Sequence, residues 1–252
     1  MIGHVSGAAR AIPLVAVAHG SRDPRAATTV EELLDEVRRA RPDLPVRAAY
    51  LDHSAPTLAG ALSGLTEAVV LPLLLTEAYH SRVDIPGALA EVTARQPRLR
   101  VRRGTTLGPH PLLTDALERR LAEAEVPLGD PETAVVLFSA GSSDRRANAT
   151  VAAIAADWAG RRGWWSVSAA YASAAEPAPS GRCGGCWRPE PPRGCLPYLL
   201  APGYFADRTR ERTLAAGAEI VADVLGPAPE VASVLLERYD QALQAGERSA
   251  TA

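Results

Sequence analysis

The sequence predicts an α/β protein made of two tandem units, each with a parallel four-stranded sheet flanked by helices. Two observations lead to this prediction. Short apolar runs alternate along the chain with segments of helical periodicity, which is typical of parallel sheets covered by helices on both faces. The same succession of motifs then occurs a second time within the 252 residues.

The repeat is carried by four pairs of matching positions in the same order. Residues 14–30 read LVAVAHGSRDPRAATTV and residues 135–151 read VVLFSAGSSDRRANATV, at an offset of 121 positions. The other pairs are Tyr50 with Tyr171, 71–80 with 196–205, and 107–111 with 225–229. We therefore expect an N-terminal half over residues 11–127 and a C-terminal half over residues 132–245.

The first elements of the N-terminal half follow from composition and spacing. Residues 13–19 form a short apolar run that ends at a glycine, which indicates a buried strand. Residues 25–40 carry aliphatic residues at helical spacing, and residues 46–52 predict the second strand. Pro56 is expected to open a short helix, because proline fits the first helical turn.

The remaining elements of this half continue the alternation. Residues 68–75 are apolar on both sides of the strand, so this strand should be central and covered on both faces. Residues 85–95 predict a helix, residues 99–107 the fourth strand, and residues 112–124 the helix that closes the unit.

Polar side chains follow the carboxyl ends of the predicted strands, which is where ligands of open parallel sheets bind. They are His19 after the first strand, Asp52 after the second, Tyr79, His80 and Arg82 after the third, and His110 after the fourth. Histidine and carboxylate together suit a divalent metal such as iron, cobalt, nickel or zinc. A pair of histidines can equally accept protons near neutral pH.

The second copy of the repeat separates functional from structural histidines. It keeps the surrounding motifs but has Ala140, Phe205 and Ala228 in place of His19, His80 and His110. Because the fold of the second copy does without them, we interpret His19 and His80 as functional. For His110 two interpretations stay open, a site residue or the cap of the following helix.

The Gly-Ser-Arg-Asp turn after the first strand also has two interpretations. Ser21 or Asp23 can cap the helix that starts near Pro24, or the turn and Arg22 can hold an anionic group. The second copy keeps Gly-Ser-Ser-Asp, so capping should be common to both copies. Because Ser143 stands in place of Arg22, the arginine is the better candidate for a functional role.

Composition excludes several functional classes. All 27 basic residues are arginine, which excludes a P-loop lysine and a Schiff-base lysine. The net charge of −2 indicates no nucleic-acid partner. The apolar runs are too short to span a bilayer, and the N-terminus lacks the pattern of a secretory signal. We therefore expect a cytoplasmic protein with no membrane partner.

Residues 176–195 interrupt the repeat. Where the first copy has a helix and a central strand, this segment is rich in Gly, Pro and Arg and contains Cys183, Cys186 and Cys195. A metal or iron–sulfur site, a disordered insertion and a local frameshift in the gene are three hypotheses for it. We favour the last two, which predict that the second half lacks a central strand.

The chain resembles the sirohydrochlorin chelatases, the class II tetrapyrrole chelatases that include cobalt-inserting relatives. The resemblance rests on AHGSRDPRA, YLD, LPLLLTEAYHSRVDIP and LGPHP and extends over nearly the whole chain. It implies two fused flavodoxin-like halves with the active site in one of them, and a monomer in which the halves are related by a pseudo-twofold axis.

The resemblance also implies a reaction, the insertion of ferrous iron or cobalt into sirohydrochlorin in siroheme or cobalamin biosynthesis. Nickel is a further candidate metal, because imidazole and carboxylate ligands accept it equally. The metal is then a substrate, and no organic cofactor is needed. By this resemblance His19 and His80 bind the metal or accept the pyrrole protons, and Asp52 is a further ligand, although the family more often has glutamate there.

The tetrapyrrole needs an apolar cleft, expected between the two halves. Arg22, Ser21, Tyr79 and Arg82 are expected to contact it, and Leu74 and Leu75 lie either near this cleft or in the core. The alternative function is a metal-binding or metal-delivery protein that uses the same histidines without tetrapyrrole chemistry.

Overall fold

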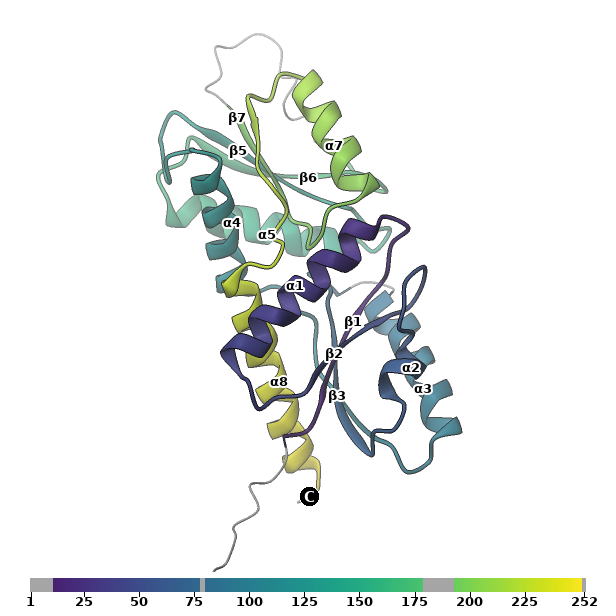
Figure 1. The fold of residues 1–252 in the computed structure, drawn as a ribbon. Helices are drawn as coiled ribbons and strands as arrows, with labels where there is room; N and C mark the ends of the chain where they lie inside the picture. Colours follow the sequence, from purple (N-terminus) through teal and green to yellow (C-terminus); the bar gives the residue numbers. More distant parts are fainter. Residues whose placement is uncertain (1–10, 78–79, 179–192, 251–252) are drawn as a thin grey trace, which may run out of the picture.

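The computed structural model describes residues 11–77, 80–178 and 193–250 and contains two parallel four-stranded sheets (Figure 1). The strands of the first sheet are β1 (Leu14–Ala18), β2 (Val46–Tyr50), β3 (Glu67–Pro72) and β4 (Arg100–Arg103). Those of the second are β5 (Ala134–Ser139), β6 (Ser166–Tyr171), β7 (Arg193–Pro197) and β8 (Ile220–Val221). The predicted α/β fold class is thereby confirmed.

Helices connect the strands in both halves. In the first half they are α1 (Pro24–Ala40), α2 (Leu58–Leu62), the π-helical turn η1 (His80–Asp84), α3 (Ile85–Arg95) and α4 (Pro111–Glu123). In the second half they are α5 (Arg145–Arg161), α7 (Tyr204–Ala215) and α8 (Pro229–Ala250). The helix predicted over residues 85–95 has the bounds of α3.

The first sheet has the strand order β2-β1-β3-β4. As predicted, the apolar strand β3 is central, and its residues after Glu67 are buried. Alternate side chains of the strands enter two separate cores. Leu14, Ala16 and Val69 pack toward α1 and α8, whereas Val15, Val17 and Val70 pack toward α2 and α3.

Several predicted boundaries are wrong. β2 and β3 end at Tyr50 and Pro72, before the predicted residues 52 and 75. Pro56 does not open α2, because its carbonyl accepts a hydrogen bond from Tyr50 N at 3.0 Å and Thr57 caps the helix instead. The fourth strand ends at Arg103, before the predicted residue 107. At Gly104 the chain passes so close to Leu71 that an added Cβ would lie 2.0 Å from its Cδ2.

The second sheet has the equivalent order β6-β5-β7-β8, and it corrects the prediction of a missing central strand. β7 begins at Arg193, inside the irregular segment, and pairs in parallel with both β5 and β8. Cys195 is fully buried in it. Pairing on both sides satisfies the backbone of this strand although its composition is poor in β-formers. Cys183 and Cys186 lie outside the described residues.

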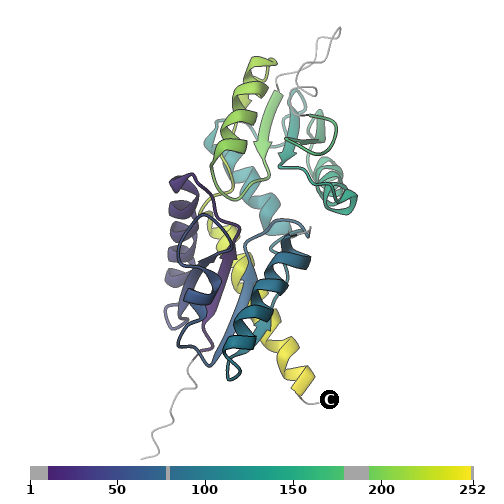
Figure 2. The same ribbon diagram turned by 90° about the vertical axis from the view of Figure 1, so that its right-hand side faces the viewer.

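The last helix of each half packs on the sheet of the other half. α8 contacts α1, β3 and β4 of the first half, and Figures 1 and 2 show it running along the first sheet. α4 contacts β7 of the second half. The Tyr239 hydroxyl donates to Ile12 O at 2.7 Å, and the Trp158 indole of α5 donates to Glu118 of α4 at 3.0 Å. One continuous hydrophobic core therefore joins both halves.

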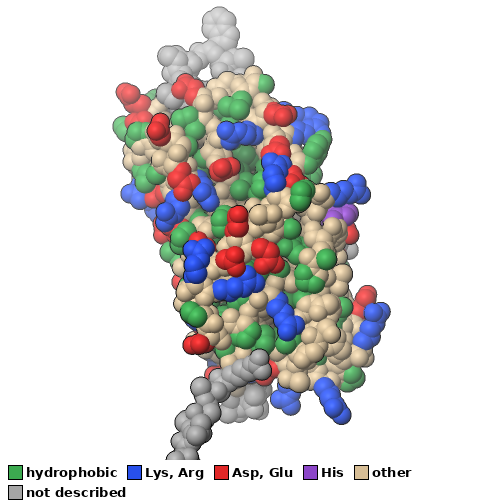
Figure 3. Space-filling model, in the orientation of Figure 1, with side chains coloured by type: hydrophobic (Ala, Val, Ile, Leu, Met, Phe, Trp, Pro, Cys, Tyr) green, Lys and Arg blue, Asp and Glu red, His purple; other side chains and the backbone are tan. Residues whose placement is uncertain are grey.

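The surface carries interspersed charges. On the face shown in Figure 3, acidic and basic side chains alternate without a patch of one sign, in keeping with the net charge of −2. Among the described residues, no helix has the length and apolar content needed to cross a membrane.

Candidate functional site

An apolar cavity of about 460 Å³ lies between the two halves. Its walls come from the loop after β3, the loop after β5, the first turns of α5 and the loop after β7. The lining residues are Leu73, Leu74, Leu75, Thr76, Ser139, Ala140, Gly141, Ser142, Ser143, Ala147, Asn148, Val151, Ala174, Tyr198, Leu199 and Leu200. Both interpretations of Leu74 and Leu75 hold, because the two side chains line this cavity and also pack against the hydrophobic cores.

His19 and Asp52 lie on neighbouring strand ends. His19 is exposed directly after β1, the neighbour of β3, and its carbonyl accepts a hydrogen bond from Asp52 N at 2.9 Å. Gly20 makes this approach possible, because it has φ +94° and an added Cβ would lie 1.7 Å from Asp52 O. The exposed Asp52 carboxylate accepts from His53 N at 3.0 Å. The backbones of His19 and Asp52 are thus in contact at this edge of the sheet, and His53 Nε2 lies 3.5 Å from Asp52 Oδ2. Imidazole and carboxylate are a donor set that suits borderline divalent metals.

The other predicted residues on this edge are only partly described. The backbone of His80 opens η1, but its side chain and all of Tyr79 lie outside the described residues. π-helical turns are rare and frequently occur at functional sites. Within the described part of the chain, no group of three or more His, Cys, Asp and Glu side chains is arranged to hold a metal ion.

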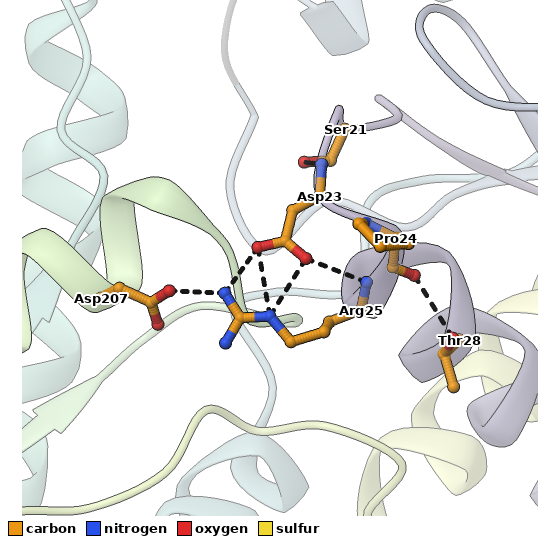
Figure 4. Close-up of polar contacts among 6 residues, drawn as sticks. All are labelled: Ser21, Asp23, Pro24, Arg25, Thr28 and Asp207. Carbon is orange, nitrogen blue, oxygen red and sulfur yellow. Dashed lines mark hydrogen bonds and ion pairs between the residues drawn. The ribbon is translucent and has the colours of Figure 1, made fainter.

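The Gly-Ser-Arg-Asp turn confirms the capping interpretation (Figure 4). Ser21 Oγ accepts from Asp23 N at 3.0 Å, and Asp23 Oδ1 accepts from Arg25 N at 3.0 Å at the start of α1. Hydrogen bonds from the Arg25 side chain and backbone also lower the pKa of Asp23. Arg22 is exposed beside this turn.

The second half repeats this arrangement at α5. Ser142 Oγ accepts from Asp144 N at 3.0 Å, and Asp144 Oδ1 accepts from Arg146 N at 2.9 Å. The prediction that both copies share the cap is therefore confirmed.

Among the ion pairs that join the halves, two are related by the repeat. Arg25 Nη2 lies 2.5 Å from Asp207 Oδ2 of α7 and holds Asp23 at the same time, as Figure 4 shows. Arg82 Nη1 lies 3.2 Å from Asp144 Oδ2. The repeat matches Asp23 to Asp144 and Arg82 to Asp207, so the two contacts lie at equivalent positions of the two copies. The predicted site residue Arg82 thus bridges to the second half.

His110 is the cap of α4. Its Nδ1 accepts from Leu112 N at 3.2 Å, and its Nε2 lies 3.0 Å from Glu237 Oε2 of α8. Of the two interpretations left open by the sequence, the structure supports the cap.

The sequence prediction missed the cavity residues of the second half, among them Asn148 and Tyr198. Asn148 donates to Ser142 O at 2.7 Å and accepts from Ser142 N at 3.0 Å, which fixes the loop after β5. The hydroxyl of the buried Tyr198 donates to Leu75 O at 3.3 Å, and burial raises its pKa. The repeat pairs Asn148 with Ala27, so a comparison of all polar differences between the copies would have found Asn148.

The family model CbiX matches the chain twice, over residues 13–124 and 134–242. Among curated proteins, a sirohydrochlorin ferrochelatase of Priestia megaterium is 29% identical over 64% of this chain and 62% of its own length. A sirohydrochlorin cobaltochelatase of Methanococcoides burtonii is 29% identical over 44% of this chain and 95% of its own length. The match thus spans less than two thirds of the longer relative.

Solved structures show the same fold. SirB from Bacillus subtilis with Fe3+ superposes with a TM-score of 0.77 at 23% identity, covering 94% of this chain and 97% of SirB. SirB from Bacillus subtilis subspecies spizizenii in complex with cobalt gives a TM-score of 0.74 at 20% identity, with the same coverage.

Proposed function

The chain belongs to the CbiX family, whose model it matches once in each half, and we propose on this basis that it inserts ferrous iron or cobaltous ion into sirohydrochlorin. The observation that carries the proposal is the apolar cavity of about 460 Å³ that is lined by the loop after β3, the strand next to β1, after which His19 follows. A flat apolar macrocycle fits such a cavity, whereas a protein that only delivers metal needs none.

The reaction exchanges two pyrrole N–H protons for one divalent cation, so charge and protons balance if two bases accept the protons. In our proposal neutral His19 and His80 are these bases, because imidazole accepts protons near neutral pH. His19 and Asp52 also replace water on the incoming cation, since imidazole and carboxylate are ligands of iron and cobalt.

The remaining roles belong to the walls of the site. Ser21, Arg22, Tyr79 and Arg82 are proposed to contact the rim of the macrocycle, where arginine can bind carboxylates in a bidentate manner. Asp23 is not assigned to the rim, because its carboxylate caps α1. Because each half covers the sheet of the other through α4 and α8, we also propose that the protein acts as a monomer.

The test is anaerobic mixing of the protein with sirohydrochlorin and ferrous or cobaltous ion, following the visible absorbance of the free macrocycle. His19→Ala and His80→Ala should each lower the metallation rate by about 100-fold, the size of a lost general base. His110→Asn is the matched control. It removes an imidazole but keeps a capping side chain on α4, so its rate should equal that of the wild type.

Wild-type protein that is folded but no faster than the uncatalysed reaction would overturn the chelatase proposal. A titration with cobaltous ion alone would then separate the alternatives. Binding that is lost in His19→Ala would leave the metal-delivery function, and no binding would exclude both.

A further inference from the structure

We propose that Arg146, from the half without the histidines, binds a carboxylate on the rim of the macrocycle. This inference rests on the proposed function, because the macrocycle supplies the carboxylate. It assigns the second half a part in substrate binding beyond its contribution to the apolar wall.

Arg146 lines a second, polar hollow of about 290 Å³. The charged and hydroxyl-bearing lining residues are Glu77, Arg82, Arg146, Arg238, Thr105, Thr106 and Thr150. This hollow adjoins the apolar cavity, because Glu77 follows Thr76 and Arg146 precedes Ala147, both of which line that cavity. A ligand with an apolar ring and an acidic rim could therefore occupy both spaces at once.

The repeat shows what kind of group Arg146 would bind. Its equivalent in the first copy, at an offset of 121, is Arg25, whose guanidinium holds the carboxylates of Asp23 and Asp207. At the second junction the position equivalent to Asp207 is Arg82. The acidic partner that the arginine has in the first copy is thus replaced by a second arginine.

The neighbouring charges leave Arg146 available. Asp144 is the equivalent of Asp23, and its Oδ2 pairs with Arg82 Nη1 at 3.2 Å. Glu77 Oε2 lies 3.8 Å from Arg82 Nη2. Arg238 donates to Leu107 O at 3.0 Å. Among the described residues, the guanidinium of Arg146 has no acidic partner.

The hollow therefore has an excess of positive charge. Three arginines and one carboxylate, Glu77, line it, and Asp144 pairs with Arg82 from outside the lining. The exposed Arg146 can present its guanidinium to a ligand from α5. A carboxylate of the macrocycle would take the place that Asp207 occupies against Arg25. Arginine favours this role because its planar donors match both carboxylate oxygens.

The experiment measures the dissociation constant of metal-free sirohydrochlorin by the change in its absorbance on binding. Arg146→Gln should weaken binding about fivefold, the factor for an exposed ion pair of about 1 kcal/mol. The matched control is Arg145→Gln, which removes the same charge one residue earlier on α5, where the side chain does not line the hollow. Arg145→Gln should bind like the wild type, and thermal unfolding checks that both variants are folded.

A second ligand identifies the contact. With the methyl ester of the macrocycle, which has no charged rim, wild type and Arg146→Gln should bind equally well. The effect of Arg146→Gln on the dissociation constant of the free acid, compared with its effect on that of the ester, then measures the coupling between Arg146 and a carboxylate.

Equal binding of the free acid by Arg146→Gln and Arg145→Gln would overturn this inference and leave the proposed function intact. An equal loss with the ester would also overturn it, because the effect would not involve charge. Wild-type protein that fails to bind the macrocycle would overturn the proposed function together with the inference.

Discussion

Replacing Gly20 by alanine would force apart the two loops that carry His19 and Asp52. The new Cβ would start 1.7 Å from Asp52 O and must reach at least 3.0 Å, so the loop after β2 must move by more than an ångström. This movement breaks the 2.9 Å hydrogen bond from Asp52 N to His19 O. A positive φ costs alanine about 1–2 kcal/mol and the lost hydrogen bond about 1 kcal/mol, so we expect about 3 kcal/mol of destabilisation.

The repeat supplies a matched control for this change. Gly141 has φ +80°, and an added Cβ would lie 1.9 Å from Ser173 O, the equivalent of the clash in the first half. Both Gly20→Ala and Gly141→Ala should lower the melting temperature, by about 6–12 °C for a loss of this size. Thermal unfolding followed by circular dichroism measures it.

Metal affinity separates the two variants. Isothermal titration with cobaltous ion should show about tenfold weaker binding for Gly20→Ala. Loss of the contacts that orient metal ligands typically lowers metal affinity by at least this factor. Gly141→Ala should bind the ion like the wild type. Unchanged affinity in a destabilised Gly20→Ala variant would refute the view that the closeness of His19 and Asp52 creates the metal site, and unchanged stability would refute the clash argument.

Two further predictions concern the contacts between the halves. Glu118→Ala leaves the buried Trp158 indole without its acceptor and removes the partner of Arg162, so urea unfolding should show a loss of about 3 kcal/mol; a loss below about 1 kcal/mol would contradict it. Burial alone would raise the pKa of Glu118, but the hydrogen bonds from Arg162 and Trp158 outweigh burial, so the pKa in the folded protein is lowered. The stabilisation by Glu118 should therefore be complete above the pKa of the unfolded chain and should disappear as the pH falls through the pKa of the folded protein. His110→Ala should cost about 1 kcal/mol through the lost cap of α4, and His110→Asn should restore most of it; equal melting temperatures for both variants would exclude the cap as the cause.

The sheet order explains why part of the site could be predicted. In parallel sheets the carboxyl ends of neighbouring strands meet at one edge, so residues after β1 and β2 had to lie together. The structure places His19 and Asp52 accordingly. Arg146 could not be found in this way, because both copies have arginine at this position and only the partner differs, Asp207 against Arg82.

The packing of the last helices could not be predicted either. The apolar periodicity of residues 112–124 shows that one face is buried, but a helix of this kind fits equally well on either sheet. β7 was missed for a related reason. Its first residues gain their stability from hydrogen bonds to β5 and β8, which no local pattern in a segment rich in Gly and Pro reveals.

Because α4 and α8 each pack on the sheet of the other half, the first half cannot be completed as soon as its own strands leave the ribosome. One face of the first sheet is completed by α8, which follows both sheets along the chain and is therefore synthesised after them. Until α8 leaves the ribosome, the apolar residues of β3 on this face, Val69 and Leu71, lack part of their cover. The half that carries the histidines emerges before the second half but is completed only after the strands of the second half have been made.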